Sequence, residues 1–219
     1  MIVYIAPEVA DILSLHSYLQ DDSFRALSIR QQLEKQAGVI QSAHEAADRR
    51  VLMHLMSWWP AARGRSPDEV MQLPFNSDDA RLVVAREYGF GDWSEVAKLA
   101  DKTPDNQFET ALDEILSGDF RAISSRLDRA PELARQRSAF GHRATLLHYL
   151  GANGVESHRQ RMPTNAPDLA RLLIDHGADI AATADMYGGG QTPYMLSASS
   201  AHPISAGIAE ELNRVLAGK

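Results

Sequence analysis

The stretch TLLHYLGANGVESHRQRMPTNAPDLARLLIDHGAD, which runs from Thr145 to Asp179, decides the fold. Thr145 is a good N-cap for a helix, because a threonine hydroxyl can accept a hydrogen bond from the backbone of the first turn. Towards the other end, Leu169, Leu172 and Leu173 recur at helical spacing. The stretch therefore predicts two short helices joined by a polar segment, with Leu172 and Leu173 contributing to the core.

Both ends of this stretch resemble an ankyrin repeat. Residues 145–148 read Thr-Leu-Leu-His where that family has Thr-Pro-Leu-His, and residues 168–179 match its second helix and its Gly-Ala-Asp ending. The next Thr-Pro stands at residues 192–193, and 192 − 145 gives a spacing of 47 residues, whereas an ankyrin unit has about 33. We therefore expect about 14 extra residues in this unit, most of them between its two helices around residues 156–166.

The resemblance extends more loosely over the rest of the chain. The segment FETALDEILSGDFRAISSRLDRAPELARQRS (108–138) looks like a degenerate unit, and a third unit begins at residue 191. Residues 80–100 are similar to the helical region that precedes the repeats in many bacterial ankyrin-repeat proteins. The resemblance implies an all-α fold: a short ankyrin-type α-solenoid of about three repeats over 103–219, with a helical N-terminal region over 1–102 as its cap.

Local signals predict where several helices begin and end. Apolar residues between 23 and 59 fall mostly at helical spacing, with either a break or a weak point of the helix expected at Gly38. Ser66 and Glu69 have the spacing of a capping box, and Ser77 is expected to start the following helix.

In the second half of the chain, residues 103–104 (Thr-Pro) are expected to open a helix that ends at Gly118, and Asp119 is expected to cap the next one. An alternating strand pattern stands out only at residues 2–5.

The composition is that of an ordinary globular protein, with 44% hydrophobic and 23% charged residues. The formal net charge of −7 argues against nucleic acid as a partner, because binding to phosphates depends on clustered lysine and arginine. The absence of cysteine excludes disulfides, thiolate catalysis and cysteine-based zinc sites. No apolar run reaches the ~18 residues that a bilayer requires, and the N-terminus lacks the basic segment of a signal peptide. We therefore expect a cytoplasmic protein that has no cofactor and does not bind membranes.

His148 has a structural explanation within the resemblance. In ankyrin repeats the histidine of Thr-Pro-Leu-His hydrogen-bonds the backbone of the turn between neighbouring repeats. We expect the same of His148, beside its N-cap Thr145. Leu146 stands where the family has proline, which weakens the match only slightly.

The segment 153–166 is the first candidate for a functional site. Glu156, His158 and Arg159 lie close together in it. Arginine can bind a carboxylate or phosphate through two parallel hydrogen bonds, and a glutamate and a histidine can exchange a proton near neutral pH. The alternative, which the sequence favours, is a solvated loop in which Glu156 pairs with Arg159 at i, i+3.

The second candidate is the glycine-rich segment 187–190 (Tyr-Gly-Gly-Gly). Glycines before a helix can present backbone N–H groups to an anion, but no Gly-Lys-Ser/Thr follows here. A turn between two repeats is therefore the better interpretation. His142 and His148 are 148 − 142 = 6 residues apart, which is not the i, i+4 spacing of a helical zinc pair, and we predict no metal site.

Two functions are compatible with these observations. The first is a module that binds a protein or a small molecule through the concave face and the inter-repeat turns. The second is an enzyme or small-molecule binder, with a polar pocket formed by the second and third repeats, the 153–166 insertion and the N-terminal cap. No oligomeric state follows from the sequence. The catalytic candidates are His148, Glu156, His158 and Tyr187, and the binding candidates are Tyr149, Asn153, Arg159, Gln191, Tyr194 and His202.

Overall fold

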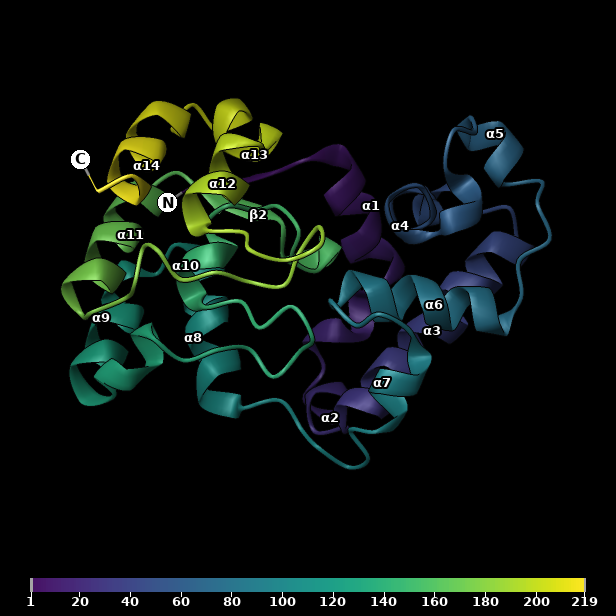
Figure 1. Cartoon of the computed structure of the whole chain (residues 1–219), viewed down its shortest axis with the longest axis horizontal. Coiled ribbons are helices and arrows are strands. Elements are labelled where there is room, and N and C mark those ends of the chain that lie inside the picture. The colour runs from purple at the N-terminus through teal and green to yellow at the C-terminus, as the bar shows by residue number, and fades with distance from the viewer. Residues whose placement is uncertain (1, 219) are drawn as a thin grey trace. The chain divides into compact units, whose positions relative to one another are not determined.

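The structure, a computed structural model, describes residues 2–218 of the chain, which form two compact units. Unit 1 comprises the chain up to Ala6 together with the chain from Asp105 onward, and unit 2 comprises Pro7–Pro104. The sequence predicts a boundary between residues 102 and 103; in the structure the first residues also belong to unit 1. Most of the regular structure in the described residues is helical (Figure 1), so the all-α prediction is confirmed at that level.

Unit 2 is organised around its longest helix, α3 (Ile29–Glu45), which packs against α6 (Ser77–Glu87). Helix α4 (Leu52–Trp58) packs against α6 as well. Helix α3 continues through Gly38, so of the two alternatives the break is wrong. Buried side chains before and after Gly38 anchor the helix and outweigh the ~1 kcal/mol that an internal glycine costs. The other elements of unit 2 are α1 (Pro7–Leu15), α2 (Asp22–Arg25), α5 (Pro67–Val70), α7 (Trp93–Ala97) and short 3-10 helices at Ser17–Gln20, Arg49–Val51 and Pro60–Ala62.

The starts of two helices in unit 2 can be compared with the capping signals in the sequence. The capping box is confirmed, because Glu69 Oε2 accepts a hydrogen bond from the Ser66 backbone N–H at 2.7 Å and the Ser66 hydroxyl accepts one from the Glu69 backbone. Helix α6 begins at Ser77, as expected, but its N-cap is Asn76, whose side chain accepts a hydrogen bond from the Asp79 backbone N–H at 3.1 Å. Asparagine caps a helix as well as serine does, so local signals do not decide which of these two adjacent residues is the cap.

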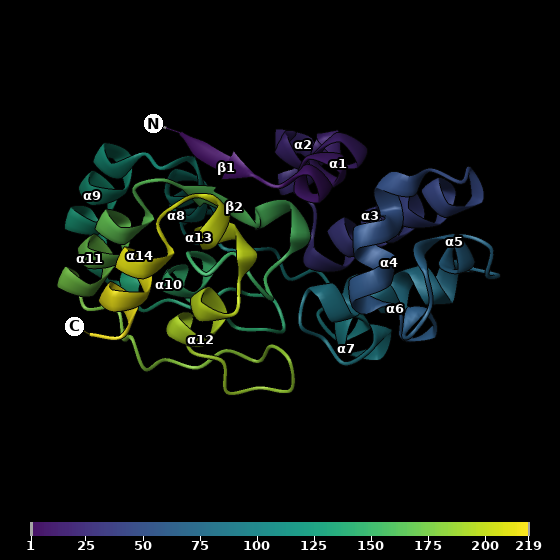
Figure 2. The same ribbon diagram turned by 90° about the horizontal axis from the view of Figure 1, so that it is seen from above.

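Within unit 1, the described helices follow one another in pairs. Helix α10 packs against both α8 and α12, and α11 packs against α14. Figures 1 and 2 show α8, α10 and α12 in one row, with α9, α11 and α14 in a second row beside it. The bounds are α8 (Asn106–Ser117), α9 (Phe120–Arg129), α10 (Leu146–Tyr149), α11 (Ala166–Asp175), α12 (Pro193–Ala198), α13 (Ala201–Ser205) and α14 (Ala209–Leu216), with 3-10 helices at Pro131–Ala134 and Ser157–Arg159.

The start of α8 lies slightly later than predicted. Residues 103–104 precede the helix, and its N-cap is Asp105, which accepts a hydrogen bond from the Phe108 backbone N–H at 3.0 Å. Gly118 ends α8 in the left-handed conformation, with φ of 76°, and Asp119 caps α9. Both of these predictions are confirmed.

A two-stranded antiparallel sheet joins the N-terminus to the insertion. Strand β1 (Val3–Ile5) pairs with β2 (Arg161–Pro163), and Tyr4 lies opposite Met162. The strand predicted at the N-terminus is confirmed. Its partner was not predicted, because a three-residue strand containing proline has no recognisable alternation.

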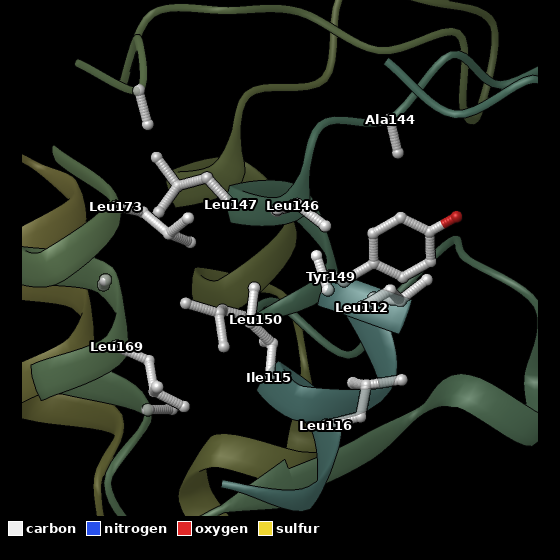
Figure 3. Close-up of a cluster of buried hydrophobic side chains, with 14 of the residues drawn as sticks. Leu112, Ile115, Leu116, Ala144, Leu146, Leu147, Tyr149, Leu150, Leu169 and Leu173 are labelled. Carbon is white, nitrogen blue, oxygen red and sulfur yellow. The ribbon is translucent and has the colours of Figure 1, made fainter. Parts of the chain in front are cut away.

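The core of unit 1 lies between its helices. Leu147 and Leu150 of the α10 segment and Leu169 and Leu173 of α11 belong to the same cluster of buried side chains (Figure 3). Leu169 and Leu173 are fully buried, whereas Leu172 is partly exposed and packs against the edge of this cluster. Across residues 2–218, no helix is both long enough and apolar enough to cross a membrane.

Candidate functional site

The insertion turns into unit 1 instead of projecting into solvent. Residues 154–158 are all buried, and Glu156 and Ser157 expose none of their surface. The expectation of a solvated loop is therefore wrong. The reason is that the charged groups of the insertion form ion pairs and hydrogen bonds with other residues of unit 1.

The Glu156 carboxylate lies at the centre of these contacts. Its Oε1 atom is 3.4 Å from the Tyr149 hydroxyl, which donates a hydrogen bond to it. The same oxygen is 3.5 Å from His142 Nε2 and 3.4 Å from Arg159 Nη1. The i, i+3 pair of Glu156 and Arg159 that the sequence predicts is therefore present, but it is buried. Tyr149 stands in α10 beside the leucine cluster, with its hydroxyl directed away from Leu169 and Leu173 (Figure 3).

Arg159 connects the insertion to the first helix of unit 1. Its Nη2 atom donates to Glu109 Oε2 on α8. Its guanidinium carbon lies 5.8 Å from the ring centre of Phe140 and 5.9 Å from that of Tyr149, which is the range of a cation–π contact. Its Nε atom donates to His158 Nε2 at 3.2 Å. One guanidinium thus holds two carboxylates and three rings in place.

These contacts determine how the carboxyl groups ionise. Burial by itself would raise the pKa of Glu156, but the charge of Arg159 and the contact with His142 outweigh burial and hold the pKa below its ordinary value. For Glu109 burial prevails, and its pKa is raised in spite of Arg159. Burial also raises the pKa of Tyr149, and the negative charge of Glu156 adds to this effect. Glu156 is therefore ionised and Tyr149 protonated at neutral pH, so neither is suited to exchange a proton with a ligand there.

His148 makes the contacts of a structural histidine. Its Nδ1 atom accepts a hydrogen bond from the Thr145 backbone N–H at 3.1 Å and lies 2.8 Å from the Thr145 hydroxyl. Its Nε2 atom lies 3.1 Å from the backbone carbonyl oxygen of Gln191 in the following turn. The ring is fully buried, and burial lowers its pKa to about 4. Both ring nitrogens are therefore used within the fold, and the ring is neutral at pH 7.

Asn153 and Tyr187 are brought together at a different place. The Tyr187 hydroxyl donates to Asn153 Oδ1 at 2.6 Å, and Asn153 Nδ2 donates to the Ser199 hydroxyl at 3.0 Å, just after α12. The aromatic ring covers Gly154, where an added Cβ would lie 3.0 Å from Tyr187 Cε2. Tyr187 therefore helps to fasten the start of the insertion to the turn before α12.

The remaining candidates do not join the Glu156 cluster. Tyr194 is exposed on α12, and Gln191 contributes its carbonyl to His148. The His202 ring, on α13, packs against Tyr4 of β1 with ring centres 6.3 Å apart.

Sequence reasoning missed three members of the cluster. Glu109 lies 50 residues before Arg159, and Phe140 and His142 lie in the turn before α10. The sequence suggests His142 only as a possible metal ligand, and its spacing from other histidines does not indicate a contact with Glu156. Across residues 2–218, no group of three or more histidine, aspartate or glutamate side chains is arranged to hold a metal ion.

Comparison with known proteins gives no guide to this site. The chain matches none of the protein-family models against which it was scanned, and searches of the curated proteins and of the solved structures found no match either.

Proposed function

We propose that unit 1 is a short stack of ankyrin-like helix pairs that binds a protein partner, and that it has no catalytic activity of its own. This proposal is carried by the contrast between the side chains that are buried in unit 1 and those that are exposed on it. Glu156, His148 and His158 are buried and make contacts within unit 1. Aromatic and apolar side chains, in contrast, are exposed on α12 and on the turn before it.

The order of helix contacts supports the repeat arrangement. In a stack, each unit contacts only its neighbours, and α10 contacts α8 on one side and α12 on the other. The hydrogen bond from His148 to the Gln191 carbonyl joins the second unit to the turn of the third. Each of these two units is preceded by a turn closed by an isolated antiparallel bridge, Arg137 with Thr145 and Ala184 with Gln191.

Met195 on α12 occupies the position in the third unit that His148 occupies in the second. It stands three residues after Thr192, as His148 stands three residues after Thr145. His148 is covered by the next turn, whereas Met195 is 50% exposed in the part of the chain that the structure describes. An apolar side chain exposed at this position favours a surface that a partner covers.

The exposed residues suit a protein partner. Tyr187 is 60% exposed and Tyr194 is 42% exposed. Tyrosine is enriched among the residues that dominate binding energy at interfaces, and methionine adapts its shape to different partners. The hydrogen bond from Tyr187 to Asn153 fixes the ring before binding, which reduces the entropy that binding would otherwise cost. A partner with an apolar helix or loop is therefore expected.

Site-specific photo-crosslinking tests this proposal. A photoreactive amino acid at position 194 should give one discrete crosslinked product in extracts of the native host, and Met195→Asp should abolish it. Phe120 on α9 is exposed to a similar extent, 41%, so the same label at position 120 is the matched control. Equal products from the two positions, or products unaffected by Met195→Asp, would refute the proposal.

A further inference from the structure

A chain of hydrogen bonds runs through the interior of unit 2, remote in sequence from the residues discussed above. Glu87 Oε2 on α6 lies 2.6 Å from His54 Nδ1 on α4. His54 Nε2 lies 3.0 Å from His16 Nε2, and His16 Nδ1 lies 2.9 Å from the Tyr18 hydroxyl. His16, His54 and Glu87 are each 1% exposed, whereas Tyr18 is partly exposed. Three buried groups are thus connected to the surface through one phenol.

The order of protons in this chain follows from the chemistry of the imidazole ring. A neutral imidazole has one N–H donor and one acceptor nitrogen. Burial, assisted by His54, lowers the pKa of His16 to about 2, so His16 is neutral. In the state in which both rings are neutral and Glu87 is ionised, His54 Nδ1–H donates to Glu87, His16 Nε2–H donates to His54 Nε2, and the Tyr18 hydroxyl donates to His16 Nδ1. Every hydrogen bond then has one donor and one acceptor.

This arrangement can accept a proton at Tyr18 and deliver it to Glu87. As a ligand transfers a proton to the Tyr18 oxygen, the original Tyr18 proton moves to His16 Nδ1. The His16 Nε2 proton moves to His54 Nε2, and the His54 Nδ1 proton moves to the Glu87 carboxylate. Both rings end as the opposite neutral tautomer, Glu87 ends as a neutral acid, and the negative charge is left on the ligand.

Lys35 places a positive charge beside Tyr18, which favours a ligand that carries negative charge. Lys35 Nζ lies 4.4 Å from the Tyr18 ring centre. Lys35 and Leu15, which precedes His16, also line a shallow cavity of about 480 Å³ along α3. Asp48 lines this cavity too, and its carboxylate is paired with Arg50 at 2.6 Å. Gly38 lies in the floor of this cavity, and a Cβ added there would have no neighbour within 4 Å. Packing therefore gives no reason for a glycine in mid-helix, and its effect is to keep the floor of the cavity open beside Lys35.

We propose that Tyr18 is the acid–base residue of a site on unit 2 for a small anionic molecule, with His16, His54 and Glu87 as its proton relay and Lys35 as the group that attracts the anion. The proposal concerns unit 2 and is independent of partner binding by unit 1. Burial raises the pKa of Tyr18, so the phenol does not ionise in advance; its proton must leave through His16 while the new bond forms.

The reactivity of Tyr18 towards sulfonyl fluorides tests this proposal. The tyrosine oxygen attacks the sulfur atom of para-fluorosulfonylbenzoate, the sulfur–fluorine bond breaks, fluoride leaves, and the phenolic proton passes to His16 and on to Glu87. Labelling of each tyrosine is followed by mass spectrometry of peptides from the full-length protein. Tyr187, whose hydroxyl donates to Asn153, and Tyr194 are the internal standards, at 60% and 42% exposure.

We expect Tyr18 to react faster than both standards at pH 7, although it is less exposed. Glu87→Gln should slow the labelling of Tyr18 by about a hundredfold, the usual effect of general-base assistance, and leave Tyr187 unchanged. Lys35→Met should slow the reaction with the anionic probe but not with uncharged phenylmethanesulfonyl fluoride.

If Glu87→Gln fails to fold, the pH dependence of Tyr18 labelling in the wild type still tests the relay. Relay assistance predicts that Tyr18 labelling reaches a plateau well below the pH at which an ordinary phenol ionises, about 10. A rate that keeps rising to that pH, or a Tyr18 that reacts no faster than Tyr187, would overturn the relay. Equal effects of Lys35→Met on both probes would overturn the assignment of an anionic ligand.

Discussion

Replacing Arg159 by alanine should destabilise unit 1 strongly. The change removes the partner of two carboxylates, Glu156, which is fully buried, and Glu109, whose side chain is 16% exposed. Removing one member of a buried ion pair costs about 3–5 kcal/mol, because the remaining charge is left without compensation. We therefore expect Arg159→Ala to lower the free energy of unfolding by an amount in this range.

Arg171→Ala is the matched control. Arg171 also contacts two carboxylates, those of Asp168 and Glu211, but its side chain is 46% exposed. An exposed ion pair contributes only about 0–1 kcal/mol, so this variant should unfold almost as the wild type does.

Urea denaturation followed by circular dichroism at 222 nm measures both variants. Trp58, Trp59 and Trp93 all lie in unit 2, so tryptophan emission shows separately whether that unit is affected. Adding Glu109→Gln to Arg159→Ala should restore part of the loss, because one of the two uncompensated charges is then absent. If Arg159→Ala costs no more than Arg171→Ala, the buried ion network does not hold the insertion and the reasoning fails.

Three further predictions concern the packing and titration of unit 1. Gly151→Ala should lower the free energy of unfolding by about 1–3 kcal/mol in urea denaturation, because the new Cβ would lie 2.8 Å from the Leu196 Cβ. An unchanged denaturation midpoint would mean that α10 and α12 lie farther apart than in the structure. Leu173→Ala should cost about 2–5 kcal/mol and Leu172→Ala clearly less, since only Leu173 is fully buried; equal losses would contradict the orientation of α11. The pKa of His148 in the folded protein, about 4, lies below its unfolded value of about 6.5. The contribution of His148 to the free energy of unfolding is therefore complete above pH ~6.5. It falls by up to about 1.4 kcal/mol per pH unit as the pH drops towards 4. Urea midpoints between pH 7 and 5 should show a weaker pH dependence in His148→Gln, and identical slopes in the two proteins would disprove this.

The helices were largely predictable because their signals are local. The capping box at Ser66 and the left-handed Gly118 depend on residues within one turn of each other, and such patterns can be read directly from the chain. The continuity of α3 through Gly38 was not predictable, because tertiary packing decided it against local propensity.

The burial of the insertion depends on contacts between residues that are far apart in the sequence. Glu156 was identified as a candidate, but whether it is solvated or buried depends on Glu109, 47 residues earlier (156 − 109 = 47), through the shared partner Arg159. The chain of Tyr18, His16, His54 and Glu87 was missed for the same reason, since His16 and His54 are 38 residues apart. A single sequence contains no pairing information at such distances.

Hydrogen exchange of residues 157–163 is the most direct test of the central claim, that the insertion is a buried and structured part of unit 1 and not a solvated loop. The Arg159 and Gln160 amides donate to the backbone of Glu156 and Ser157, and β2 is paired with β1. We predict that a peptide covering these residues exchanges as slowly as one covering α10. Exchange at the rate of an unprotected chain, while α8 and α11 stay protected, would contradict the account.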